Sequence, residues 1–458
     1  MEMVKRSLIL AGGGVRLAYH AGVLKALEEH HLSFNHIDAT SGGIFGAAML
    51  ASGIHAEEAG QRWRDLKLKN FVSGLPFKYY LSQRTLPALG SNKTMRTKIF
   101  PALGIEVQKI NQHTTNEITF NVCNFSNKTI EAIHHKDVTE DHLIAGMSLP
   151  IFMPSIQIKK DWYTDAVWIK DANLTEAVNR GAEEIWLVWC IGNTRKYHNG
   201  FLNQYVHMIE ISANGALFDE ITQIHKLNSL REKDGLKPIV LHVIKPRFSL
   251  PLDPDFFLNK IDADTLINMG YADAKQYLNK PLNFDFNKTI SSATSMEEAD
   301  ETLHFRQQFY GQIVFERAIK KIEIHLTYYV RKTGNQIVYQ QFSSIKINQQ
   351  SFISGYNNVV SVLGKGELES VFEFICNGEI NNANLKINLQ SLTNIWLGLS
   401  AKNAKVSIGK SIANKEPIIM QQPAKNRLKN AFYLNLKSDH SWFRRIMIKR
   451  NMLKHLFK

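Results

Sequence analysis

The chain has 458 residues, of which 44% are apolar, 10% aromatic and 21% charged, a composition that excludes a disordered protein and indicates a globular one. This length exceeds one ordinary hydrophobic core and predicts two or three domains. The formal net charge of +13 comes mostly from the segment Ile419–Lys458, where ten Lys and Arg residues accompany one acid, so the rest of the chain offers no basic groove for nucleic acid.

The N-terminal apolar run is too short to direct secretion or to cross a membrane. It spans Ser7–Ala11 and stops at three glycines, so we interpret it as a first strand rather than a signal peptide. No stretch approaches the roughly 18 apolar residues that a membrane-spanning helix needs. The three cysteines are far apart and odd in number, which argues against a disulfide framework or a metal site. We therefore expect a cytoplasmic protein, with at most peripheral membrane contact.

The first part of the sequence alternates strand and helix patterns. Buried strands are predicted at Ser7–Ala11, Phe34–Ala39, Glu184–Ile191 and Pro238–Ile244, and a hairpin is predicted at Phe120–Cys123 and Ile130–Ile133. Helical periodicity covers Val15–Glu29, Gly42–Ser52 and Asp262–Leu278. Strands separated by helices predict an α/β fold with a mainly parallel central sheet.

The pattern changes after a polar segment without periodicity, which we interpret as a linker. Strand-like segments with polar turns follow at Leu303–Val314, Lys321–Val330, Gln336–Ile347, Val359–Cys376 and Asn384–Leu392. They predict a smaller all-β domain of ordinary size. The expected organisation is an α/β domain at 1–285, a linker at 286–300, an all-β accessory domain at 301–420 and a basic amphipathic tail at 421–458.

Three consecutive glycines stand between the first predicted strand and the first predicted helix. Gly12, Gly13 and Gly14 allow a tight turn with uncovered N–H groups, and the helix N-terminus adds a positive dipole end. Such a loop suits an oxyanion, either a phosphate or the alkoxide of an acyl-transfer intermediate. A glycine turn without a ligand is the structural alternative. Arg16 either binds a phosphate head group or braces the loop through hydrogen bonds to carbonyl groups.

A second strand-to-helix turn holds small residues from Ala39 to Gly43, with Ser41 at its centre. Small neighbours permit the sharp turn of a nucleophile elbow, which exposes the serine hydroxyl. A serine at a helix start also serves as an N-cap, so a structural interpretation competes with the chemical one. Asp165 lies in a loop-like segment, where an aspartate by itself is ordinarily a turn former.

The order and spacing of these motifs resemble those of the patatin-like phospholipases over about residues 5–280. That family has a Gly-Gly-Gly-x-Arg-Gly loop, then a Gly-x-Ser-x-Gly elbow, and much later an Asp-Gly-Gly or Asp-Gly-Ala motif. Here the loop is Gly12–Leu17, the elbow follows at Ser41, and Asp165 comes after a segment, Ala145–Pro154, that is similar to the family's own. An α/β-hydrolase would instead place its elbow after several strands and a histidine late in the chain.

The resemblance implies a patatin-like three-layer fold and a Ser-Asp dyad. Asp165 would accept the proton of Ser41, whose hydroxyl attacks an ester carbonyl, while the amides of Gly12 to Gly14 form the oxyanion hole. The chain would then be a lipid acyl hydrolase of the phospholipase A or lysophospholipase type, with no cofactor and no metal. No histidine is required, and we interpret the lone His20 as structural.

Three positions depart from the family pattern. Leu17 replaces the last glycine of the loop, Ala39 replaces the first glycine of the elbow, and Ala166 replaces the glycine after the aspartate. These departures motivate an alternative function, a non-catalytic lipid-binding or interaction protein on a degenerate patatin scaffold. Hydrolysis that depends on the serine and the aspartate would separate the two.

A dinucleotide-binding loop is a further alternative. It would use Gly12 and Gly14, with Asp38 as the acid that holds a ribose hydroxyl. Leu17 removes the last glycine of that fingerprint, and the elbow at Ser41 would go unexplained.

The last residues, 441–458, combine basic and apolar side chains. We expect this segment to contact an anionic membrane surface, and the alternatives are a solvated tail or a helix docked on the β-domain. The residues expected at the membrane are Trp442, Phe443, Arg444, Arg445, Lys449 and Arg450. The expected partner is a phospholipid or another acyl lipid, and nucleic acid is not expected.

Overall fold

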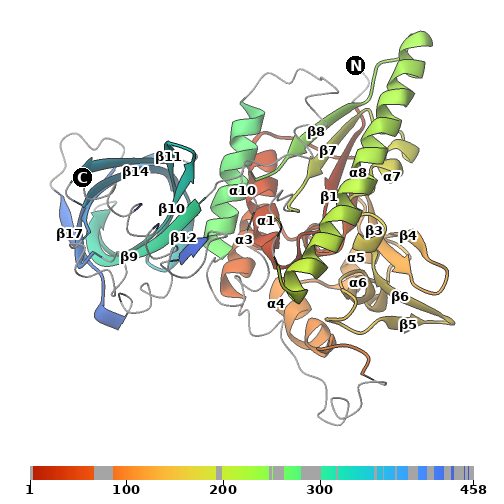
Figure 1. The fold of residues 1–458 in the computed structure, drawn as a ribbon, viewed down its shortest axis with the longest axis horizontal. Helices are drawn as coiled ribbons and strands as arrows, with labels where there is room; N and C mark the ends of the chain where they lie inside the picture. The colour runs from red at the N-terminus through yellow and green to blue at the C-terminus, as the bar shows by residue number, and fades with distance from the viewer. Residues whose placement is uncertain are drawn as a thin grey trace. The chain divides into compact units, whose positions relative to one another are not determined.

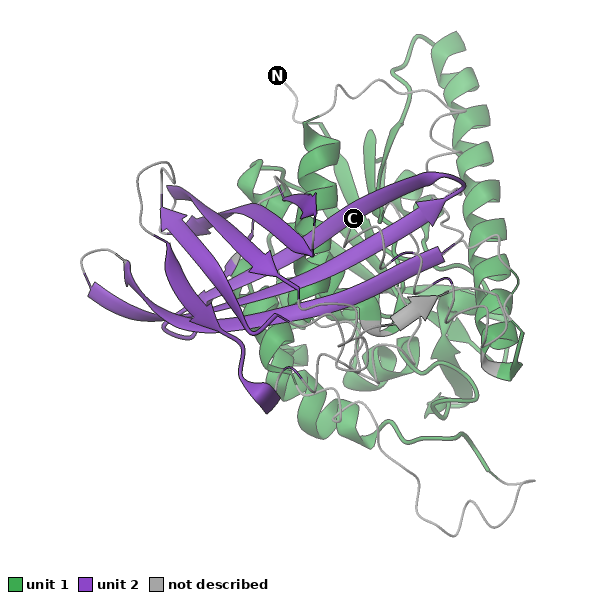
Figure 2. Cartoon of the chain, turned by 60° about the vertical axis from the view of Figure 1, so that its left-hand side comes forward, with its two compact units in different colours: residues 1–297 green, residues 298–458 purple. Residues whose placement is uncertain are grey.

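The computed structural model describes residues 4–66, 86–191, 197, 199–246, 250, 263–279, 301–315, 318–354, 358–364, 366–376, 379–389, 401–409, 417–425, 427, 435–437, 448 and 452. The chain divides into two compact units, Met1–Glu297 and Glu298–Lys458, which Figure 2 colours separately. The division falls inside the polar segment 286–300. Unit 1 carries the glycine loop, Ser41 and Asp165.

Unit 1 is built on a mixed sheet that has eight strands in its described residues. The strand order is β5-β6-β3-β2-β1-β7-β8, with β4 paired to β3. Strands β3, β2, β1, β7 and β8 run parallel, whereas β4, β5 and β6 join at one side through antiparallel pairs. The bounds are β1 Arg6–Leu10, β2 His36–Thr40, β3 Glu117–Asn124, β4 Thr129–His134, β5 Ile156–Ile158, β6 Asp161–Asp165, β7 Glu184–Val188 and β8 Val240–Ile244.

Helices cover both faces of this sheet, with α8 on one side and α1 and α10 on the other (Figure 1). The α-helices are α1 Ala18–Glu29, α2 Gly43–Ala51, α3 Ala56–Asp65, α4 Phe100–Leu103, α5 Val107–Asn111, α6 Glu140–Gly146, α7 Leu174–Asn179, α8 Phe201–Lys233 and α10 Ala263–Leu278. Short helices of other types are η1 Gly14–Leu17, η4 Met95–Ile99 and η5 Ala166–Trp168. On one face, Leu187 and Trp189 pack against Leu217 and Ile221 of α8. These layers confirm the predicted α/β fold with a mainly parallel sheet.

The sheet brings the three predicted motifs to one edge. β1 and β2 are parallel neighbours, so the turns that follow them, at Gly12 and Ser41, emerge at the same end of the sheet. β3 lies next to β2 and pairs antiparallel with β6, where Val122 is opposite Asp165. The last residue of β6 therefore reaches the elbow, although the two lie far apart in the sequence.

Unit 2 is an antiparallel sheet with ten strands in its described residues, in the order β12-β11-β10-β9-β17-β16-β15-β14-β13, with β18 paired to β9. The bounds are β9 Glu301–Phe315, β10 Ala318–Thr333, β11 Gln336–Ile347, β12 Gln350–Ile353, β13 Val359–Gly364, β14 Glu367–Cys376, β15 Glu379–Asn388, β16 Asn403–Gly409, β17 Ile418–Gln421 and β18 Asn435–Lys437. A bridge from Ser354, which follows β12, to Phe374 of β14 links two parts of the sheet that are far apart in the strand order. Its core includes Phe309, Leu326 and Leu385, which confirms the predicted all-β unit.

One predicted strand of unit 2 is wrong. The segment Val359–Cys376 forms two antiparallel strands, β13 and β14, rather than one. Gly364 and Gly366 have positive φ angles of 92° and 79°, which fit the turn between the strands. The core-facing residues Val362 and Leu368 both have even numbers, so the alternation of apolar residues continues through the turn and conceals it.

Two described residues of the tail pack on unit 2. Met452 is 1% exposed within the unit 2 core, and Ile448, one helical turn earlier, packs against the same core. For these two residues the contacts favour docking on the β unit. The six residues predicted to contact a membrane lie outside the described residues. Among the helices that the structure describes, none has the length and apolar content to span a bilayer.

Candidate active site

Ser41 occupies the turn between β2 and α2. Its φ angle of 51° lies in the left-handed region, which a residue with a side chain adopts rarely and at a cost on the order of 1 kcal/mol. The N-cap of α2 is Gly42, and no side chain caps this helix. Ser41 therefore does not cap the helix, and its backbone has the strained conformation expected of a nucleophile elbow.

Asp165, the last residue of β6, meets this hydroxyl. Ser41 Oγ donates a hydrogen bond of 2.6 Å to Asp165 Oδ2, and the Val167 N–H donates one of 2.9 Å to Oδ1. Burial raises the pKa of Asp165 to about 7, while the hydrogen bonds from Ser41 and Val167 act in the opposite direction. A carboxyl group that titrates near neutrality and touches a hydroxyl group is suited to accept its proton.

The glycine loop supplies free backbone donors next to the serine. The Gly12 N–H donates to the Asp171 carbonyl oxygen at 3.3 Å and is therefore engaged. Within the described part of the chain, the N–H groups of Gly13 and Gly14 have no hydrogen-bond partner. Two free N–H groups in one loop can bind an anion.

Arg16 points its guanidinium group into the protein and is only 8% exposed. Nη1 donates to the Cys190 carbonyl oxygen at 3.2 Å, and Nε has no partner among the described atoms. Burial raises the pKa values of Asp171 and Glu210, and the positive charge of Arg16 lowers both. Of the two roles that the sequence left open, the carbonyl contact fits bracing of the loop.

The three departures from the family pattern do not separate the serine from the aspartate. Leu17 packs on the residue after the serine, since a Cβ at Gly42 would lie 2.6 Å from Leu17 Cδ1. Ala39 is fully buried in β2 and Ala166 is fully buried in η5. Their small side chains fit these turns, and the contact between the hydroxyl and the carboxylate remains in place.

The structure also brings together residues that the sequence did not single out. Asp171 is fully buried behind the glycine loop, and neither of its carboxyl oxygens has a hydrogen-bond partner among the described residues. Tyr205 of α8 donates to the Pro150 carbonyl oxygen at 2.5 Å, and its ring meets Trp168 edge-on at 5.5 Å. Asp171 lies in a loop and Tyr205 lies inside a long helix, and neither belongs to a sequence motif. Only their tertiary contacts single them out.

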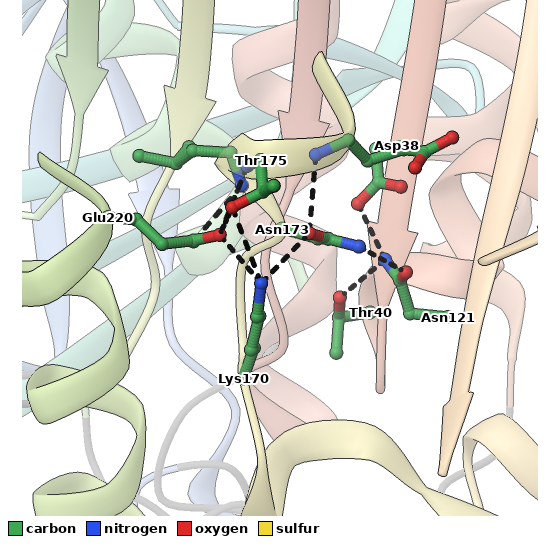
Figure 3. A network of polar contacts seen from close by, with 9 residues as sticks. Asp38, Thr40, Asn121, Lys170, Asn173, Thr175 and Glu220 are labelled. Carbon is green, nitrogen blue, oxygen red and sulfur yellow. Dashed lines mark hydrogen bonds and ion pairs between the residues drawn. The ribbon is translucent and has the colours of Figure 1, made fainter. Parts of the chain in front are cut away.

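A buried polar network supports the elbow from behind (Figure 3). Asn121 of β3 is its centre, because its Nδ2 donates to Asp38 Oδ1 at 2.6 Å and to Thr40 Oγ1 at 3.0 Å. Asn173 Nδ2 donates to Asn121 Oδ1 at 2.9 Å, which ties the loop after Asp165 to the elbow strand.

The network continues from this loop to α8. Lys170 Nζ donates to Glu220 Oε1 at 2.8 Å and lies 3.4 Å from Asn173 Oδ1. The N–H groups of Leu174 and Thr175 also donate to the Glu220 carboxylate, at 3.1 and 3.0 Å. Glu220 therefore holds the start of α7 and the segment between Asp165 and α7 against α8.

Two other polar residues are structural. Asp38 is fully buried and accepts hydrogen bonds from Thr119 and Asn121, so it has no surface for a ribose and the dinucleotide-binding interpretation does not fit. Burial lowers the pKa of His20 to about 3, which keeps this residue neutral inside the protein. Among the described residues, no group of three or more His, Cys, Asp or Glu side chains is arranged to hold a metal ion.

Part of the chain is similar to a known protein family. Residues 8–178 match the family model of the patatin-like phospholipases. Among solved structures, the crystal structure of VipD from Legionella pneumophila is similar at 13% sequence identity and a TM-score of 0.30, over 61% of this chain and 67% of that one. No curated protein matches the chain.

Proposed function

Because residues 8–178 match the family model of the patatin-like phospholipases, we propose that the chain is a lipid acyl hydrolase whose dyad is Ser41 and Asp165. The substrates are fatty-acid esters of phospholipids or lysophospholipids. The observation that carries this proposal is the hydrogen bond of 2.6 Å from Ser41 Oγ to Asp165 Oδ2. The free N–H groups of Gly13 and Gly14 beside it add further support.

The reaction follows from these contacts. Ionised Asp165 takes the proton of Ser41 as Oγ attacks the ester carbonyl carbon, and the carbonyl oxygen gains negative charge. The N–H groups of Gly13 and Gly14 stabilise that charge, by about 3 kcal/mol for a well-placed donor. The alcohol leaves with the proton held by Asp165, and an acyl-serine remains. Water then attacks the acyl carbon and gives a proton to Asp165. Asp165 passes this proton to Ser41 Oγ as the bond from Oγ to the acyl carbon breaks and the fatty acid is released.

The test is release of free fatty acid from vesicles of phosphatidylcholine and, separately, from lysophosphatidylcholine micelles. We expect wild-type protein to release fatty acid, and Ser41→Ala and Asp165→Asn to abolish the release. Ser7→Ala is the matched serine control, because Ser7 is also buried but its hydroxyl contacts His36 at 3.1 Å rather than the dyad. We expect this control to keep the wild-type rate.

The same assay separates the non-catalytic alternative. A wild-type chain that binds the vesicles but releases no more fatty acid than Ser41→Ala would be a lipid-binding protein on this scaffold. A triacylglycerol emulsion as a third substrate distinguishes a phospholipase from a neutral lipase, since the proposal expects faster turnover of the phospholipids.

We further propose that the basic residues of the tail attract the enzyme to anionic membranes, at roughly 1 kcal/mol per basic residue near the surface. Substituting Arg444, Arg445, Lys449 and Arg450 by Gln keeps Ile448 and Met452, the two residues that pack on unit 2. We expect this variant to sediment less with vesicles that contain phosphatidylserine. The matched control substitutes as many lysines elsewhere in unit 2, at Lys321, Lys386, Lys402 and Lys405. Equal loss in both variants would reject a specific role for the tail.

A further inference from the structure

Asp171 is a buried acid that the proposed reaction does not use. It lies between η5 and α7 with no exposed surface, and neither carboxyl oxygen has a hydrogen-bond partner in the described part of the chain. Its backbone is fixed, because its carbonyl oxygen accepts the Gly12 N–H and the polar network holds the neighbouring residues Lys170 and Asn173 (Figure 3). Buried carboxyl groups without a partner are rare and demand a physical explanation.

The carboxyl group of Asp171 and the side chain of Ser41 both approach the glycine loop at Gly12. A Cβ at residue 12 would lie 2.1 Å from Asp171 Oδ1 and 2.8 Å from Ser41 Cβ. Only glycine fits between these two side chains. The position also places the acid beside the loop whose free N–H groups the proposed reaction uses.

The groups around Asp171 favour its protonated form. Burial raises the pKa of Asp171 well above its usual range, nearby Asp165 raises it further, and Arg16 and the Gly12 N–H lower it. Cys190 also faces this carboxyl, and burial raises the pKa of its thiol, so it is neutral. The charge of Arg16 also acts on Glu210 of α8. Asp165 ionises first, because two hydrogen bonds stabilise its charge, and that charge then opposes the ionisation of Asp171.

We propose that Asp171 is a positioning acid that must stay protonated for Ser41 to react, and that its ionisation sets the upper pH limit of the enzyme. As a neutral acid it leaves the glycine loop free to receive the oxyanion. Once ionised, it places a fixed negative charge next to that loop, which opposes the charge that develops in the transition state. The inference rests on the proposed role of Ser41 as nucleophile.

The test measures the rate at which a fluorophosphonate labels Ser41 as a function of pH, in wild-type protein and in Asp171→Asn. Asparagine has the same shape and cannot ionise. We expect the wild-type rate to rise as Asp165 ionises near pH 7 and to fall at more alkaline pH. In Asp171→Asn the rise remains and the fall is absent, so the variant reacts on the order of tenfold faster at the alkaline end. A purely structural role would lower the rate at every pH without changing the profile.

The outcomes separate this inference from the proposed function. Wild-type protein that labels no faster than Ser41→Ala would overturn both. Rapid labelling of the wild type together with an unchanged alkaline fall in Asp171→Asn would overturn the inference alone. The wild type also tests it without any substitution, should Asp171→Asn not fold, because a rate that reaches a plateau and never falls at alkaline pH contradicts it. Asp38→Asn is the control, and its alkaline fall should match that of the wild type.

Discussion

Two buried polar clusters flank the elbow strand β2, and they differ in how their groups are partnered. The supporting network is Asp38, Thr40, Asn121, Asn173, Lys170 and Glu220, whereas the proposed reactive cluster is Ser41, Asp165 and Asp171. Burial raises the pKa values of Asp38 and Asp165 alike, to about 7. The carboxylate of Asp38 meets fixed partners, Thr119 and Asn121, but that of Asp165 meets a hydroxyl group on a strained turn. A raised pKa therefore marks burial, and the partners distinguish support from chemistry.

The largest effect on kcat/KM should come from removing the carboxylate of Asp165, compared with removing that of Asp38. We expect Asp165→Asn to lower kcat/KM for a soluble ester by about 10³-fold or more, because the serine loses its base. Asp38→Asn is the matched substitution at a buried carboxyl with a similar pKa, and we expect kcat/KM to stay within about tenfold, since Asp38 does not touch the hydroxyl. Steady-state kinetics on both variants provides the measurement. A comparable loss in Asp38→Asn would show that the distinction between the clusters is mistaken.

A glycine substitution tests how tightly the reactive cluster is packed. Gly12→Ala would place a Cβ 2.1 Å from Asp171 Oδ1, so the loop must move, and we expect kcat/KM to fall by about 10²-fold. Gly215 on α8 has no atom within 4 Å of its hypothetical Cβ. Gly215→Ala should therefore raise the free energy of unfolding by about 0.5–1 kcal/mol and leave kcat/KM unchanged. Kinetics and thermal unfolding of both variants are the measurements, and wild-type kinetics in Gly12→Ala would contradict the packing described here.

A substitution in the supporting network should lower the stability of the protein more than its activity. Asn121→Ala removes the donor to Asp38 and Thr40 and the acceptor for Asn173, and leaves buried polar groups without partners. We expect the free energy of unfolding to fall by about 2–5 kcal/mol. Asn127→Ala is the control at an exposed turn, where a change below about 0.5 kcal/mol is expected. Urea unfolding compares the two, and equal midpoints would mean that the network adds no stability.

The sequence predicted some helices and strands of unit 1 better than others. The four predicted strands and the predicted hairpin of unit 1 follow from short apolar runs with turn residues between them, and the structure has them within a few residues of the expected bounds. Strands β5 and β6 were not predicted, because the segment that ends at Asp165 was interpreted as a loop. The long helix α8 was not predicted. Its outer face carries exposed apolar residues, Phe201, Met208, Ile211 and Phe218, which blur the amphipathic pattern.

Order and spacing singled out Ser41 and Asp165, because a glycine loop, an elbow and a late aspartate form a family pattern. The sequence could not single out Asp171. This residue follows another acid by six positions and has the pattern of an ordinary turn aspartate. Its environment depends on Gly12 and Arg16, which come from the other end of the domain. Asn121 was not singled out for the same reason. The role of an asparagine in a strand depends on its hydrogen-bond partners, and these follow from the register of the sheet.

The smallest effect concerns how stability depends on pH, where the two clusters should behave alike. Asp38 and Asp165 each have a pKa of about 7 in the folded protein against 3.8 as the ordinary value. Their protonated forms are favoured in the folded state, so their contribution to stability is full below about pH 4 and is lost as pH rises through 7. In that window the folded chain holds a proton that the unfolded chain has released. Each group should therefore lower the free energy of unfolding by about 1.4 kcal/mol per pH unit.

Asp38→Asn and Asp165→Asn should each flatten this slope by a similar amount in urea unfolding between pH 4 and 7. A steeper fall in either variant than in the wild type would show that the carboxyl group is ionised on folding, opposite to the direction argued from burial. The pH dependence of activity should distinguish Asp38 from Asp165, although the pH dependence of stability does not. Asp38→Asn should keep the rise in activity near pH 7, whereas Asp165→Asn should abolish it. The supporting and reactive carboxyl groups differ in what they touch, so an assay that requires the serine is needed to tell them apart.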